Sequence, residues 1–332
     1  VVPEAREGDA PKARAGGNRL ARGRSHAGRR AVGDTALALV VIAAMGFARG
    51  LYANELLLFN FMMFMTLAQG LNIIYGFTGY LPFGYVGFYG AGAYGFALAV
   101  MHLHLAPLPA MLCAAAAALI LGIILIPLLR LSGAYFAIAS LAAAQATYEI
   151  IANPTLEEIT KGPYGVSLTS VFAPAFSYYV GLLVMALTLL AVVFLRNSRF
   201  GLSLQAIRED PVSAEMAGVS VVRGRIIAWL LSALIAGLVG GAFAWHISVF
   251  YPDSAFDLGI SIFAVVFTLF GGITTLTGPL LGVLILYGVY NWIGISVPQY
   301  FQLIYGALIM VLVLFLPNGL VSLLTSRGIR VP

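Results

Sequence analysis

The chain has 332 residues, of which 61% are hydrophobic and 9% are charged, and its net charge is +5. Globular domains are about half apolar and a quarter charged, so this composition excludes a soluble protein and indicates a polytopic membrane protein. Helical spans of about 20 residues with short loops leave room for about 8–10 crossings. We therefore predict an all-α fold with one membrane domain over residues 35–322.

Residues 1–34 differ in composition from the rest of the chain. They are rich in Ala, Gly and Arg and hold few large apolar side chains, which predicts disorder. Basic residues stand where a secretory signal peptide would have its apolar stretch, so a cleaved leader is not expected. An arginine run could bind nucleic acid or anionic lipid, but directly before a first span it more often holds the N-terminus inside. We interpret 1–34 as a disordered, basic, cytoplasmic tail without a nucleic-acid partner.

Ten apolar segments are candidates for membrane-spanning helices. They lie at about 35–49, 53–75, 80–101, 107–129, 132–153, 172–195, 226–250, 258–270, 279–294 and 300–316. The segments 258–270 and 279–294 are short for a hydrocarbon core of about 30 Å at 1.5 Å per residue, so they could instead form a re-entrant pair. Their linker, which includes Thr274 and Thr275, would then be irregular backbone that lines a cavity or packs against protein.

The basic residues favour one orientation of these segments. With the N-terminus inside, every Lys and Arg except Arg49 and Lys161 falls on the cytoplasmic side. Such a bias is the rule for the cytoplasmic loops of membrane proteins. We therefore expect both termini, including a short tail at 323–332, in the cytoplasm.

A glycine-rich passage at 76–95 has two readings. Small residues recur at every fourth position within it and again in a later span, which favours close packing of helix backbones. They are Gly87, Ala91 and Gly95, and Ala233, Gly237 and Gly241. For Gly76, Gly79 and Pro82 we instead favour irregular backbone along a pathway.

Few polar side chains lie within the predicted spans. Glu149 forms a stripe with Gln145 and Asn153 on one helix face. An acid inside a membrane is a functional hypothesis by default, but near the outer end of its helix a glutamate can also reach water. In the second span, Asn60, Gln69 and Asn72 could bond neighbouring helices or line a pathway.

Two kinds of site are not expected. The chain has no phosphate-binding loop of the G-x-x-x-x-G-K-[ST] type, and its only lysines are Lys12 and Lys161, so it is not an ATPase. No carboxylate or cysteine stands at ligand spacing from any histidine, so we expect no metal site. The one cysteine, Cys113, is interpreted as a packing residue.

A charged island at 196–225 separates two long apolar segments. It reads RNSRFGLSLQAIREDPVSAEMAGVSVVRGR. Ser203 can cap a helix through LQAIRED, Pro211 with Asp210 before it can open a second helix, and Gly218 can end that one. The apolar residues of the island indicate a side that needs a partner, which favours docking over a solvated loop. They are Ile207, Met216, Ala217 and Val219.

Six motifs follow one another along the chain. They are GLNIIYGFTGYLPFGYVGFYGAGAY at 70–94, LRLSGAYFAIASLA at 129–142, TKGPYGV at 160–166, FGLSLQAIREDPVSAEMAGVSV at 200–221, FTLFGGITTLTGPLLGV at 267–283 and LFLPNGL at 314–320. In this order they resemble the permease subunits of ABC importers for branched-chain amino acids, specifically the M-type member of the usual pair. The resemblance covers about residues 53–322.

This resemblance implies an ABC importer permease fold and a set of partners. The partners are a second, similar permease subunit, two cytoplasmic ABC ATPase subunits that hold the ATP and Mg, and an extracytoplasmic substrate-binding protein. Membrane lipid and a small-molecule substrate are the other contacts. No cofactor is expected in this chain, and the localisation expected is the bacterial plasma (inner) membrane.

The resemblance also assigns roles to residues. The segment that matches 206–219 corresponds to the coupling helix in a cleft of the ATPase, which places Arg208, Glu209, Asp210, Glu215 and Gly218 at that contact. The candidates for the translocation path are Asn72, Gly76, Gly79, Tyr80, Pro82, Tyr85, Gln145, Glu149, Thr274 and Thr275. Family members often carry glutamine, serine and histidine in place of Tyr80, Pro82 and Tyr85, and these departures bear on the solute more than on the fold.

We therefore expect a permease that moves a small polar solute such as leucine, isoleucine or valine by alternating access. Related importers carry urea, short amides or other amino acids, and these remain alternatives. A stand-alone secondary carrier or channel would instead use Glu149 as its coupling residue. In a third reading, the chain is a structural half whose permease partner makes all the substrate contacts.

Overall fold

The structure is a computed structural model that describes residues 15–52, 54–296 and 298–300, with side chains from Val32 onward. It also describes residues 303, 304, 306, 307, 310, 319 and 320. Most of the tenth predicted segment, at 300–316, and the predicted tail at 323–332 therefore lie outside the described residues.

Long apolar helices make up most of the described chain. They are α1 (Ala15–Leu51), α2 (Glu55–Leu71), α3 (Val86–His102), α4 (Pro107–Ile124), α5 (Gly133–Ile151), α7 (Pro174–Asn197), α10 (Val221–Ile247), α12 (Leu258–Gly271) and α13 (Thr277–Ser296). Within the described part, eight helices are long and apolar enough to cross a membrane. The prediction of an all-α, polytopic membrane fold is confirmed.

Short elements connect these helices. The short α-helices are α6 (Glu157–Thr160), α8 (Arg199–Glu209), α9 (Pro211–Met216) and α11 (Pro252–Ala255). A π-helix, η1 (Asn72–Gly76), extends α2, and 3₁₀ turns lie at η2 (Ile126–Arg130), η3 (Pro154–Leu156), η4 (Gly162–Tyr164), η5 (Thr169–Val171) and η6 (Pro298–Tyr300). Strands β1 (Val166–Ser167) and β2 (Val249–Phe250) form one short antiparallel pair.

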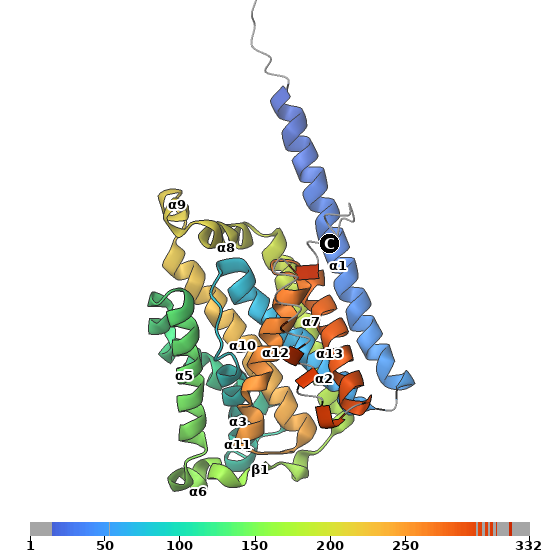
Figure 1. The fold of residues 1–332 in the computed structure, drawn as a ribbon, viewed down its shortest axis with the longest axis vertical. Helices are drawn as coiled ribbons and strands as arrows, with labels where there is room; N and C mark the ends of the chain where they lie inside the picture. Colours follow the sequence, from blue (N-terminus) through green and yellow to red (C-terminus); the bar gives the residue numbers. More distant parts are fainter. Residues whose placement is uncertain are drawn as a thin grey trace, which may run out of the picture.

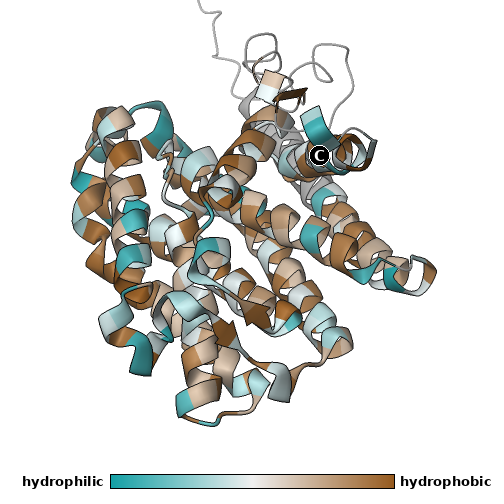
Figure 2. Ribbon diagram, turned by 60° about the horizontal axis from the view of Figure 1, so that its bottom comes forward, coloured by the Kyte–Doolittle hydropathy of each residue, from teal (hydrophilic) through white to brown (hydrophobic). Residues whose placement is uncertain are grey.

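The helix α10 lies at the centre of the fold and packs against α3, α4, α7 and α2. Figure 1 shows α5 along one side of the molecule and α1 along the other, with α8 and α9 at one end and α6, β1 and α11 at the opposite end. We call these the α8 end and the α6 end. Hydrophobic residues cover the long helices on their outer as well as their inner faces, as a lipid environment requires (Figure 2).

Close backbone packing joins α3 to α10, and of the small residues predicted to pack closely Gly237 takes part in this contact. A Cβ at Gly92 would overlap the carbonyl of Gly237, and a Cβ at Gly240 would overlap the carbonyl of Tyr89. Only glycine allows two helix backbones to approach this closely. The two helices form a seam, the glycine seam, that holds the centre of the bundle together.

The first helix is longer than the sequence predicts. Where disorder is expected up to residue 34, the structure has helix from Ala15 onward, and α1 passes through residue 34 without a break. Alanine and arginine both have high helix propensity, which is the local reason. Asp34 is buried and accepts a hydrogen bond from Arg196 at 2.8 Å, so this part of α1 is tied to the end of α7.

The third helix starts later than predicted. Hydropathy places its beginning near residue 80, but α3 begins at Val86, after irregular backbone. The amide of Gly84 donates to Ser140 Oγ of α5 at 3.2 Å, and the amide of Val86 donates to Ser261 Oγ of α12 at 2.7 Å. Irregular backbone within a membrane domain requires such partners, because no water reaches it there.

The helices α12 and α13 lie side by side and are joined by a five-residue turn at 272–276, the α12–α13 turn. Sequence length suggested that they could form a re-entrant pair. In the structure α13 has 20 residues, and α11 extends the shorter α12 to a span of 20 residues at Pro252–Gly271. Both are therefore long enough to cross, which favours two full spans.

Candidate functional site

The island between α7 and α10 folds into the two short helices α8 and α9 (Figure 1). Ser198 has extended backbone and its hydroxyl accepts a hydrogen bond from the amide of Gly201 at 3.0 Å, so Ser198 caps α8. The predicted cap, Ser203, lies inside α8 and donates its hydroxyl to the carbonyl of Phe200. That prediction was wrong because the helix begins one turn earlier than its apolar pattern suggests.

The helix α9 begins and ends at the residues that the sequence predicts. Asp210 accepts a hydrogen bond from the amide of Val212 at 3.0 Å, and Pro211 occupies the first helical position. The hydroxyl of Ser213 also donates to Asp210, and these bonds hold the pKa of its carboxyl below the usual range. Gly218 has φ of +84° and closes the helix with a bond from its amide to the carbonyl of Glu215.

The helix α8 faces the body of the protein. Leu204 and Ile207 are 0% and 1% exposed, and Ile207 packs against Gly224 of α10. Arg208 is half-buried, and its Nη1 donates to the carbonyl of Gly76 at 2.9 Å. One of the five predicted coupling residues thus points into the membrane domain.

The other four predicted coupling residues are exposed: Glu209 ends α8, and Asp210, Glu215 and Gly218 lie on α9 or directly beside it. Two apolar side chains accompany them. Val212 is 65% exposed and Met216 is 79% exposed, and Val212 was not among the predicted apolar residues. Two exposed apolar side chains beside acids are the composition that the docking prediction expects. We call Val212, Glu215, Met216 and Gly218 the α9 surface.

Part of the predicted translocation path comes together in one hydrogen-bonded cluster. Asn72 Nδ2 donates to the carbonyl of Thr275 at 3.0 Å, and the amide of Thr274 donates to Asn72 Oδ1 at 2.9 Å. Gln69 Nε2 donates to the carbonyl of Leu276 at 2.6 Å. The second span therefore holds the α12–α13 turn through two buried amide side chains, and we call this arrangement the Asn72 cluster.

The two amide side chains of the second span make the bonds that the first of its two readings expects. Gln69 and Asn72 are fully buried and bonded to another segment of the chain, as interhelical hydrogen bonds require. The α12–α13 turn is irregular backbone that packs against protein, because Asn72 and Gln69 take its polar groups.

The aromatic candidates of the glycine-rich passage take different positions. Tyr80 lies between the guanidinium of Arg225, 4.6 Å from its ring centre, and the ring of Phe136, at 5.0 Å. Tyr85 is buried, and its hydroxyl donates to the carbonyl of Ser232 on α10 at 3.1 Å. Pro82, which lies between these two tyrosines in the sequence, is buried. Gly79 is exposed and has φ of +80°.

Arg225 was not predicted as a site residue. Its Nε is buried and has no hydrogen-bond partner among the described residues. Its guanidinium makes a cation–π contact with the Tyr80 ring. The sequence signal was its position, because Arg225 is the last charged residue before the long apolar stretch that makes up the rest of α10.

The remaining candidates, Gln145 and Glu149, lie on the outer face of α5. Gln145 Nε2 donates to Glu149 Oε1 at 2.9 Å, and both side chains are exposed. Asn153 does not extend this stripe, because it lies beyond α5 and accepts a hydrogen bond from the amide of Thr155. The path candidates thus fall in three places, which are the Asn72 cluster, the surroundings of Tyr80 and the outer face of α5.

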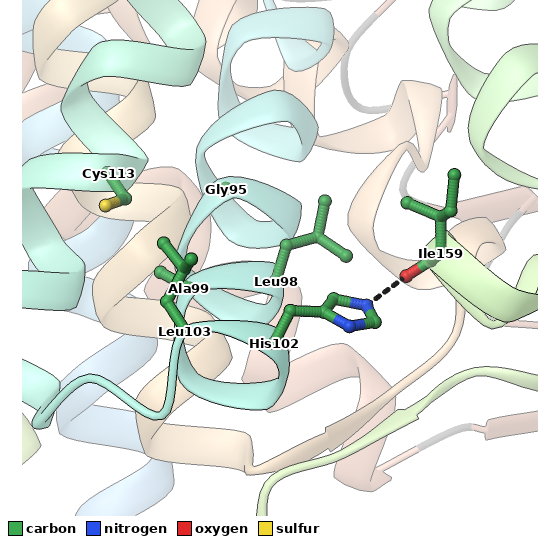
Figure 3. Close-up of a pocket in the computed structure, with 7 residues that line it drawn as sticks. All are labelled: Gly95, Leu98, Ala99, His102, Leu103, Cys113 and Ile159. Atoms are coloured by element: carbon green, nitrogen blue, oxygen red, sulfur yellow. Dashed lines mark hydrogen bonds between the residues drawn. The ribbon is translucent and has the colours of Figure 1, made fainter.

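A cavity of about 440 Å³ opens near the C-terminal end of α3, and its lining is almost entirely apolar (Figure 3). It is lined by Gly95, Leu98, Ala99, His102, Leu103, Cys113 and Ile159. His102 Nε2 lies 2.8 Å from the carbonyl of Ile159 and so fixes one wall. None of the predicted site residues lines this cavity.

Comparison with known proteins gives one consistent result. The family model described as "Branched-chain amino acid transport system / permease component" matches residues 55–314. Over 297 residues the chain is 31% identical to the high-affinity branched-chain amino acid transport system permease protein LivM of Escherichia coli (strain K12), covering 79% of this chain and 68% of that protein.

Shorter matches extend to permeases for other solutes. The chain is 36% identical over 146 residues to the fructose import permease protein FrcC of Rhizobium meliloti, covering 42% of this chain and 40% of that protein. It is 32% identical over 77 residues to the guanosine ABC transporter permease protein NupQ of Bacillus subtilis (strain 168), covering 23% of this chain and 24% of that protein. No solved structure matches the chain significantly.

Proposed function

Because the chain belongs to the family of branched-chain amino acid transport system permease components, we propose that it carries leucine, isoleucine and valine as one permease subunit of a bacterial ABC importer. The family makes the chain a multi-pass permease component of an ABC importer. Beyond this, we propose the solute, the orientation of the chain in the membrane and the partner chains.

The choice of solute is supported by how much of the chain each relative matches. The branched-chain amino acid permease matches 79% of the chain, whereas the fructose and guanosine permeases match 42% and 23%. The family model, which matches residues 55–314, covers the second span, the glycine-rich passage and α5 together. Branched-chain amino acids are therefore the first solutes to test, and sugars are the second.

Charge supports placing the α8 end in the cytoplasm. Arg199, Arg208, Arg223 and Arg225 all lie in or beside α8 and α9, and the N-terminal end of α1 lies at the same end (Figure 1). Cytoplasmic loops carry such an excess of arginine. In this orientation the α9 surface faces the ATPase subunits in the cytoplasm, and the α6 end faces the substrate-binding protein outside the plasma membrane.

The outer face of α5 is where we place the contact with the solute and the second permease. Gln145 and Glu149 are exposed polar groups on a helix whose other exposed side chains include Ile138 and Ile150. Polar groups in a span rarely face lipid, and they mark a water-filled path or a protein neighbour. Gln69, Asn72 and Tyr85 are buried and bonded, so in this proposal they support the path without lining it.

The test is uptake into proteoliposomes that hold this chain with a second permease, the ATPase subunits and the binding protein. We expect uptake of radiolabelled leucine that requires ATP at the ATPase side and is reduced by excess unlabelled valine but not by fructose or urea. An ATPase subunit that binds ATP without hydrolysing it is the matched control.

Two results would contradict the proposal in different ways. ATP-dependent uptake of fructose or urea but not of leucine would keep the importer and change the solute. Leucine uptake by this chain alone, without nucleotide, would indicate a secondary carrier, and Glu149→Gln would then be the first variant to measure.

A further inference from the structure

We propose that Arg208 acts inward as a positioning residue, joining the island between α7 and α10 to the Asn72 cluster. Movement of α8 and α9 would then reach the α12–α13 turn through one line of contacts. This inference rests on the proposed function, in which ATPase subunits move the α9 surface.

The first contact of the line is the bond from Arg208 to Gly76. Arg208 Nη1 donates to the carbonyl of Gly76 at 2.9 Å, and the Arg208 stem also passes Gly79, where a Cβ would lie 3.5 Å from Cγ. A hydrogen bond from a charged donor is about twice as strong as a neutral one. The partly buried position of Arg208 limits competition from water.

The second contact lies within one turn of helix. Gly76 ends the π-helix that Asn72 begins, and a Cβ at Gly76 would overlap Asn72 Oδ1 and lie 3.1 Å from the amide nitrogen of Thr274. No side chain fits between these groups. A shift of Gly76 toward these groups must therefore displace Asn72 or the α12–α13 turn.

The third contact is the pair of bonds between Asn72 and that turn. Asn72 donates to the carbonyl of Thr275 and accepts from the amide of Thr274, so the side chain is fixed at both ends. Three segments that are far apart in the sequence, 199–209, 72–76 and 272–276, thus meet in a continuous series of contacts.

The backbone around Gly76 is suited to a change of shape. A π-helix has one more residue per hydrogen-bonded ring than an α-helix, and single π turns are frequent at functional sites. Directly after it, Gly79 has φ of +80° and residues 79–85 are irregular. The ring of Tyr80 in this segment lies under Arg225 of α10, so two arginines from different helices hold the same short stretch.

Arg208→Gln removes the charged donor and is the variant that tests the line. In the assembled importer we expect the ATPase subunits to remain bound and basal ATP hydrolysis to stay within about twofold, while leucine uptake per ATP falls about tenfold, within the range of known coupling energies. Arg208→Lys keeps a cation that can donate to Gly76, so it should restore part of the uptake. Arg223→Gln is the matched control, because Arg223 is exposed at the start of α10 and carries the same charge.

Two outcomes would overturn the inference. If Arg208→Gln releases the ATPase subunits, Arg208 is a docking residue and not an inward one. If Arg208→Gln takes up as much leucine per ATP as the wild type, the bond to Gly76 does not transmit movement of α8 and α9. A wild-type complex that hydrolyses ATP but takes up no solute would instead count against the proposed function.

Hydrogen exchange tests the same line without any assumption about the solute. In wild-type complex, a non-hydrolysable ATP analogue should change the exchange of amides in 72–80 and 272–277 together with those of α9. In Arg208→Gln, we expect α9 to respond and the other two segments to lose most of their response. An unchanged response of 72–80 in this variant would refute the proposal.

Discussion

The helices α8 and α9 are separated by a single residue, Asp210, yet they meet opposite surroundings. Leu204 and Ile207 of α8 are buried against the protein's own helix α10, whereas Val212 and Met216 of α9 are among the exposed hydrophobic residues. Their hydropathy is alike. The difference shows that an apolar residue in a cytoplasmic loop can serve the fold or a partner, and that only the position of a third segment, α10, decides which.

The largest expected difference is in stability. Leu204→Ala should destabilise the purified chain by about 2–5 kcal/mol, because it opens a cavity in a closed core. Met216→Ala should change the stability by less than about 0.5 kcal/mol, because its side chain is already exposed. Thermal unfolding of both variants in the same detergent measures the contrast, and equal shifts would show that α9 is packed as α8 is.

The second difference concerns binding of the ATPase subunits. Met216→Glu should weaken their binding to detergent-solubilised permease by about tenfold or more, equivalent to at least about 1.4 kcal/mol. Leu202→Glu is the control, because Leu202 is exposed and apolar but belongs to α8. Titration with purified ATPase subunit gives both affinities. A loss of affinity with Leu202→Glu that matches the loss with Met216→Glu would extend the docking surface to α8.

The end of α9 gives a smaller effect with a different cause. Gly218 has φ of +84°, and nothing lies within 4 Å of a Cβ placed there, so backbone conformation and not space restricts the residue. Gly218→Val should cost about 1–2 kcal/mol of local stability, and Gly218→Asn should cost less, because asparagine tolerates this conformation. Hydrogen exchange of the α9 amides measures the difference. Equal protection in the two variants would refute this explanation.

The smallest predicted difference lies within α8 itself. Ser198→Ala removes the cap and should cost about 1 kcal/mol, whereas Ser203→Ala should be nearly neutral, because Ser203 only bonds back to its own helix. Thermal unfolding of the two alanine variants separates them. The opposite order would restore Ser203 as the cap.

The spans were predictable because length and hydropathy determine them. The segments predicted at 107–129 and 132–153 correspond to Pro107–Ile124 and Gly133–Ile151. The start of α3 was not predictable in this way, since residues 80–85 are largely apolar although their backbone is irregular. What allows that irregularity is a pair of hydroxyl groups, Ser140 and Ser261, from segments far along the chain.

The site was predictable in its residue types but not in its pairings. Asn72 and Thr274 were both candidates, and they turn out to be bonded across 202 residues of sequence. Arg208 was assigned outward by resemblance to a coupling helix, and its bond to Gly76 spans 132 residues. Nothing local in the sequence distinguishes an arginine that faces a partner from one that turns toward its own chain, because the helix face depends on where α10 lies.

The glycine seam between α3 and α10 has a consequence for how such a protein can diverge. Where Gly92 meets the carbonyl of Gly237 and Gly240 meets that of Tyr89, the contact is made by backbone alone. A larger residue on one helix cannot be compensated by a smaller one on the other, because no side chain is left to shorten. The seam therefore tolerates no exchange of residues, whereas the exposed side chains on the outer face of α5, such as Ile138 and Ile150, can be exchanged without disturbing it.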